Sequence, residues 1–94
     1  MTVLKVAHVR EQGIDLIICP LDDEFARRPI SAQQQAAAEI QRRSSAAGLA
    51  GTVVPVWRDP SGRMGFLAPT NWHAFFRSVS LDWVWLNINR QLSW

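Results

Sequence analysis

The sequence is poor in several residue types that mark particular classes of protein. Its 94 residues include one cysteine, two histidines and no tyrosine. The single cysteine, Cys19, excludes an internal disulfide framework and a four-cysteine zinc site. No apolar run approaches the roughly 20 residues that span a membrane. Lys5 and His8 interrupt the apolar start of the chain, and no small-residue cleavage site follows, so no secretory signal is expected.

The motifs of common catalytic and cofactor sites are also missing. There is no glycine-rich phosphate loop, dinucleotide fingerprint, HExxH or GxSxG. In the expected first hairpin His8 lies opposite Leu16 or Ile17 rather than Cys19, which argues against a Cys–His dyad. The acidic run 22–24 lacks the spacing of a calcium loop. We therefore expect a protein that is not an enzyme and that uses no cofactor and no metal.

Composition and charge favour one small folded domain, residues 1–94. Apolar residues make up 48% and charged residues 19% of the chain, which excludes compositional disorder. The net charge is +2, and nine of the ten basic residues are arginine. Residues 1–30 hold four basic and five acidic side chains, and 31–94 hold six and three. This mild basic bias is more typical of solvated charges than of a nucleic-acid surface. The expected location is the cytoplasm.

Two strands are predicted at the start of the chain. Residues 3–10 are rich in valine, and 14–19 are almost continuously apolar, which is typical of a central strand covered on both faces. The short turn between them contains Gly13, so the pair predicts an antiparallel hairpin.

A long helix is predicted after an irregular connection at 20–30. Ser31 and Gln34 have capping-box spacing, residues 32–47 are strong helix formers, and Gly48 suits the end of the helix. The expected buried stripe consists of Ala36, Ile40, the stem of Arg43, and Ala47. The expected solvated face consists of Gln33, Gln34, Gln35, Glu39, Gln41 and Arg42.

A second hairpin is predicted from strands at 52–58 and 63–68. The turn between them, Asp59-Pro60-Ser61-Gly62, has residue types that favour tight turns. Pro55 lacks a backbone N–H, so its strand is expected at a sheet edge or with that position facing outward. Gly65 indicates a bulge or a close approach.

Two helices are predicted at the C-terminal end, over 71–79 and 81–91. Ser80 is a suitable start for the second, whose inward stripe is Leu81, Val84, Trp85, Ile88 and Leu92. The alternative is a strand, because apolar residues also alternate from Val84 to Ile88.

These elements predict an α+β fold with ββαββα order and an extra C-terminal helix. The helices are expected to pack on one face of the sheet. The opposite face would then be open, and a homodimer would cover it.

Tryptophan is the most informative residue type, since five in 94 residues is about four times the usual share. On a continuous C-terminal helix, one outward stripe would hold Trp83, Asn87, Arg90 and Trp94. The alternative is that this face packs on the 71–79 helix or on the sheet, which would bury the rings inside the monomer. Tryptophan and arginine are typical of protein-interface hot spots. We therefore expect a protein-interaction or regulatory module that binds a protein partner or a second copy of itself.

The alternative function is nucleic-acid binding. Trp57 with Arg58 and Arg63 across the second hairpin would combine ring stacking with phosphate contacts.

Overall fold

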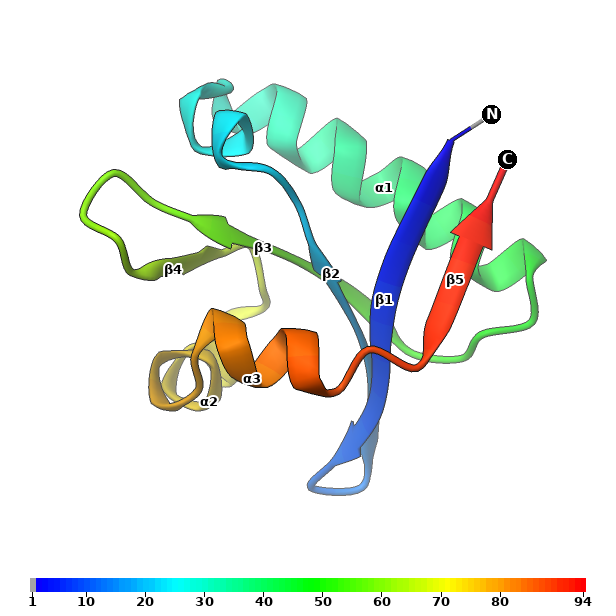
Figure 1. Ribbon diagram of the computed structural model, residues 1–94. Helices are drawn as coiled ribbons and strands as arrows, with labels where there is room; N and C mark the ends of the chain where they lie inside the picture. The colour runs from blue at the N-terminus through cyan, green and yellow to red at the C-terminus, as the bar shows by residue number, and fades with distance from the viewer. Residues whose placement is uncertain (1) are drawn as a thin grey trace.

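The computed structural model describes residues 2–94 as a five-stranded mixed sheet with a helix layer on each side (Figure 1). The strands are β1 (Val3–Glu11), β2 (Ile14–Pro20), β3 (Thr52–Arg58), β4 (Met64–Phe66) and β5 (Arg90–Ser93). The helices are α1 (Ile30–Ala46), α2 (His73–Ser78) and α3 (Leu81–Leu86), with short 3-10 turns η1 (Asp23–Arg27) and η2 (Thr70–Trp72). The strand order is β4-β3-β2-β1-β5, and the β2–β3 pair is parallel. The predicted α+β class is confirmed.

The first hairpin forms as its sequence predicts. Gln12 and Gly13 make the turn with φ values of 53° and 76°, and His8 pairs with Ile17. Glycine tolerates this left-handed geometry because it has no Cβ. The hairpin places the continuous apolar run of β2 at the centre of the sheet.

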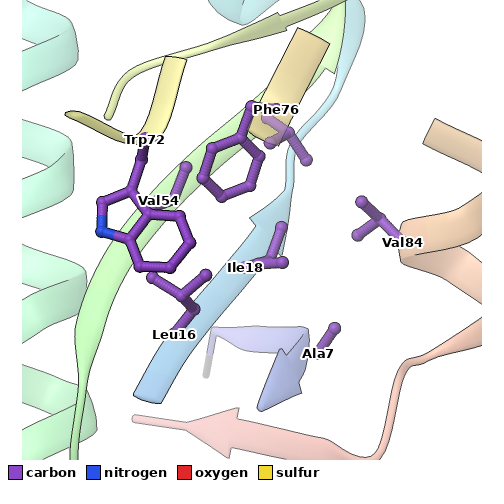
Figure 2. Close-up of a cluster of buried hydrophobic side chains, with 8 residues drawn as sticks. Ala7, Leu16, Ile18, Val54, Trp72, Phe76 and Val84 are labelled. Atoms are coloured by element: carbon purple, nitrogen blue, oxygen red, sulfur yellow. The ribbon is translucent and has the colours of Figure 1, made fainter. Parts of the chain in front are cut away.

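Alternation along β2 creates two hydrophobic cores, one on each face of the sheet. One core packs beneath α2 and α3 (Figure 2); its buried residues are Ala7, Leu16, Ile18, Val54, Val56, Trp72, Phe76 and Val84. The other packs beneath α1; its buried residues are Val6, Ile17, Cys19, Ile40, Val53 and Leu92. The prediction that all helices share one face is wrong, because β2 needs apolar cover on both sides. The homodimer argument from an open face loses its premise.

Helix α1 starts earlier than predicted, and glutamines expected in solvent contact the rest of the protein. It begins at Ile30 with Pro29 at the N-cap position, and no side chain caps it. Gln33, expected in solvent, is buried and donates a hydrogen bond from Nε2 to the Phe25 carbonyl oxygen at 2.8 Å. The Gln41 amide bonds the Gly51 carbonyl oxygen at 3.0 Å and the Val53 N–H at 2.9 Å. These glutamine hydrogen bonds hold α1 against η1 and against the chain at the start of β3.

Strand β3 lies inside the sheet although it contains Pro55. The carbonyl of Pro55 accepts a hydrogen bond from Leu67, which follows the last residue of β4. The missing proline donor therefore faces the point where the short strand β4 has already ended. The edge strand is thus β4 rather than the expected strand 52–58, and Pro55 is tolerated because β4 has ended on the side that its missing N–H would face, while β2 pairs with β3 on the other side.

The predicted C-terminal helix divides into α3 and β5. Asn87 caps α3, and its Nδ2 donates to the Trp83 carbonyl oxygen at 2.8 Å. Asn89 then bonds both the backbone N–H and the backbone carbonyl of His8, at 2.8 and 2.9 Å. This side-chain amide imitates a strand partner and directs the chain onto the edge of β1. No helix among residues 2–94 has the length and apolar character needed to cross a membrane.

Candidate functional site

A cleft of about 520 Å³ lies between the second hairpin and the α2–α3 pair. We call it the arginine cleft, because Arg58, Arg63 and Arg77 all line it. Its apolar lining is Met64, Phe66, Phe76, Val79 and Leu81, and Ser80 and Asp82 complete it at the start of α3. The cleft thus combines exposed positive charges with apolar and aromatic surface.

Strand geometry and a rigid turn position two of the three arginines. Arg58 ends β3 on the same face as Val54 and Val56, the face covered by α2 and α3. Arg63 follows a turn in which Asp59 Oδ1 accepts hydrogen bonds from the Ser61 hydroxyl, at 2.6 Å, and from the Arg63 N–H, at 3.0 Å. The Ser61 hydroxyl is the main cause of a lowered pKa at Asp59, and the charge of Arg63 adds to it. The carboxylate therefore stays charged and keeps the turn closed.

The charges of the cleft are available to a ligand. Among residues 2–94 the ion pairs join Arg10 to Asp15, and Arg42 and Arg43 to Glu39. None of these pairs involves a cleft arginine. Arginine stays protonated at any physiological pH and can hold a carboxylate or phosphate through two parallel hydrogen bonds. The arrangement is suited to binding an anion.

The structure does not bring the seven predicted binding residues into one surface. Arg58 and Arg63 line the cleft. Trp57 is 8% exposed and packs against Phe25 on the opposite face, with ring centroids 5.0 Å apart. The predicted helical stripe of Trp83, Asn87, Arg90 and Trp94 is wrong, because the chain changes from helix to strand between Asn87 and Arg90. Trp83 packs on Phe75, and Trp94 pairs with Thr2.

The exposed aromatic surface belongs to a different tryptophan. Trp85, expected in the core, is 52% exposed, and Leu86 beside it is 85% exposed. Trp85 lies four residues after Leu81 and three after Asp82, which line the cleft. Residues with these spacings share a helix face, so Trp85 lies on the face of α3 that includes Leu81 and Asp82.

Sequence reasoning missed Arg77, Asp82 and Trp85 as members of this site. Arg77 and Asp82 reach the cleft because α2 and α3 pack against a sheet that includes the second hairpin. No motif encodes that long-range contact. The available signal was weaker: Arg77 directly follows a pair of phenylalanines, Phe75 and Phe76.

The cysteine and histidines form no catalytic constellation in residues 2–94. Cys19 pairs across the sheet with Pro55 and is fully buried, and burial raises its thiol pKa to about 12. The nucleophilic thiolate is therefore scarce near neutral pH. His8 Nε2 bonds the Ala50 carbonyl at 2.8 Å, and His73 Nε2 bonds the Ala68 carbonyl at 3.0 Å. Each ring therefore links its own element to another backbone segment through a hydrogen bond.

The buried thiol predicts an alkaline loss of stability. Below pH 9 the Cys19 thiol keeps its proton in both the folded and the unfolded chain. Between pH 9 and about 12 the unfolded thiol ionises from its ordinary pKa of 9.0 while the folded thiol does not. Stability therefore falls as pH rises, by up to about 1.4 kcal/mol per pH unit. Urea unfolding at several pH values measures this slope, and Cys19→Val should flatten it. Equal slopes in the two proteins would contradict the burial.

Comparisons with known proteins leave the cleft to be interpreted by its geometry: no family model, no curated protein and no solved structure matches this chain.

Proposed function

We propose that the protein is a non-catalytic interaction module, acting in the cytoplasm, whose arginine cleft binds an acidic segment of a protein partner. The single observation that supports this function is the set of three arginines around an apolar floor that form no ion pair within residues 2–94. A segment with acidic residues beside a large apolar side chain matches both parts of the cleft. The apolar side chain would pack on Phe66 and Phe76, and the carboxylates would pair with the guanidinium groups.

The surface around the cleft agrees with a protein partner. Trp85 and Leu86 are exposed on α3, the helix whose first two residues line the cleft. Tryptophan and arginine are residue types that dominate the binding energy of protein interfaces. Arginine binds anions but does not transfer protons at neutral pH, and Asp82 is the single carboxylate lining the cleft. These features support binding rather than general acid–base catalysis.

Nucleic acid is the second candidate, and the same arginines with the exposed Trp85 ring favour it. Phosphates would pair with the guanidinium groups, and a base would stack on the indole. Asp59 and Asp82 lie beside the arginines and oppose any anion, but they oppose a continuous phosphate backbone more than a peptide segment with a few carboxylates. The net charge of +2 is also small for a protein that tracks a nucleic-acid strand. Because of these charges, we favour an acidic protein segment over nucleic acid as the ligand.

Fluorescence anisotropy with two labelled probes tests the proposal. One probe is a peptide of alternating acidic and leucine or phenylalanine residues, and the other is single-stranded DNA of similar length. We expect the peptide to bind more tightly at physiological ionic strength. Arg58→Gln, Arg63→Gln and Arg77→Gln should each weaken peptide binding about tenfold, because each removes a charge-assisted hydrogen bond.

Arg90→Gln is the matched control, because Arg90 is exposed on β5 and does not line the cleft. It should leave peptide affinity within about twofold, since a distant exposed charge is screened by salt. Equal losses in Arg90→Gln and in the cleft variants would indicate nonspecific charge attraction and reject the site. Tighter binding of the DNA would reject the protein partner in favour of the second candidate.

A further inference from the structure

A second groove lies on the other side of the sheet, away from the arginine cleft. It has a volume of about 240 Å³ and is lined by residues of α1, of η1 and the segment before it, of the start of β1, and of the chain after β5. Figure 1 shows these segments at the top of the view. Its apolar walls are Leu4, Leu21, Phe25, Ala36, Ile40 and Trp94. The volume is below the usual range for drug-sized ligands, so an occupant would be a small molecule with one compact apolar group.

The mouth of the groove offers one free positive and one free negative side chain. Arg28 lies over the Phe25 ring, 5.8 Å from its centroid, and has no carboxylate within ion-pair distance in residues 2–94. Asp22 precedes η1, and its side chain makes no capping hydrogen bond there. Glu39 also lines the mouth, but Arg42 and Arg43 already neutralise it. A ligand therefore meets Arg28 and Asp22 as the unpaired charges.

We propose that this groove binds a free amino acid with a large apolar side chain. The side chain occupies the apolar walls, the α-carboxylate pairs with Arg28, and the α-ammonium pairs with Asp22. A ligand with only a carboxylate would pair with Arg28 but would be repelled by Asp22. A ligand with only an amine would pair with Asp22 but would be repelled by Arg28. A zwitterion satisfies both charges, which is why the mouth favours an amino acid over either class.

NMR titration of the whole chain with L-phenylalanine tests this assignment. We expect saturable shift changes at groove residues, including the Trp94 indole, at millimolar ligand. 3-Phenylpropionate lacks the ammonium and 2-phenylethylamine lacks the carboxylate, and each should bind about tenfold more weakly. Arg28→Gln should weaken the binding of L-phenylalanine by a similar factor, and L-phenylalanine should then bind no more tightly than 2-phenylethylamine. Absence of saturable shifts, or equal binding of the three ligands, would overturn the proposal.

Two alanines of α1 provide a matched pair of variants. Ala36 lines the groove, whereas Ala38 is exposed on the same helix. Ala36→Phe should fill the groove and abolish binding, while Ala38→Phe should bind as the wild type does. Circular dichroism and thermal unfolding of both variants check that they fold. If Ala36→Phe folds and still binds L-phenylalanine normally, the groove is not the site, and the proposed role of the arginine cleft is unaffected.

Discussion

We expect Phe76→Ala to lower the free energy of unfolding by about 3–5 kcal/mol, the usual cost of removing a buried aromatic ring. Phe76 is 1% exposed and packs on Phe66 and Phe75 with ring centroids 5.6 and 5.1 Å away. It belongs to the core beneath α2 and α3 (Figure 2), and it also lines the arginine cleft. Because natural domains are stable by only about 5–15 kcal/mol, this loss is a large share of the total.

Urea denaturation followed by circular dichroism measures this effect, and Phe75→Ala is the control. Phe75 is the neighbouring ring on α2, but it is only half-buried. Its removal leaves a smaller cavity, so the Phe75 variant should be the more stable of the two. The reverse order would show that α2 presents the other phenylalanine to the sheet.

The second large effect is expected from Gly51→Ala, with a loss of about 2–4 kcal/mol from backbone strain and steric overlap together. Gly51 has φ +130°, a conformation that side chains strongly disfavour. A Cβ there would lie 2.7 Å from the Asp15 carbonyl oxygen, which is backbone and cannot rotate away. The Gln41 side chain and the His8 ring also hold this connection through the Gly51 and Ala50 carbonyls.

Gly48→Ala separates the two causes. Gly48 also has a positive φ, +83°, but nothing lies within 4 Å of its added Cβ. Its substitution should cost only the left-handed backbone penalty, about 1–2 kcal/mol. The difference between the two midpoints of urea unfolding measures the contact with Asp15. Equal losses at both glycines would show that the connection before β3 shifts to make room.

The parts of the fold that follow from local sequence were predictable. The first hairpin depends on a glycine turn between two apolar runs, and the second on the Asp59–Gly62 turn. Gly65 was expected to mark a bulge or a close approach, and the close approach is found, because an added Cβ would overlap the Trp57 indole. In each case the residues that decide the structure are near neighbours in the chain or across one hairpin.

The remaining parts depend on contacts between distant segments. A helical wheel extended through 81–91 placed Trp85 in the core, but α3 ends at Leu86, the following chain pairs with β1 through Asn89 and His8, and Trp85 is 52% exposed. Ser31 has good capping chemistry, yet the Pro29 carbonyl accepts the first helical hydrogen bond, from Gln33, so the cap lies two residues earlier than predicted. Helix propensity and hydrophobic periodicity carry no information about contacts with distant segments. Tertiary packing therefore overrides the local preference.

The candidate site also combines residues that local sequence could predict with residues that depend on tertiary packing. Arg58 and Arg63 could be paired from the sequence because a four-residue turn separates them. Arg77 could not be joined to them, because its position depends on how α2 packs on a core assembled from β1, β2 and β3. The exposed Trp85 was likewise misplaced by the wheel.

The pairing of β1 with β5 has a consequence for how the chain acquires its structure. The two hydrogen bonds between Asn89 and His8 close a separation of 81 residues, whereas the β1–β2 hairpin is local. Joining distant segments carries a larger loop-closure entropy, so this step should come late in folding and slow it. β5 should then be the first strand to open transiently in the folded protein, exchanging its amide hydrogens before the central strands do.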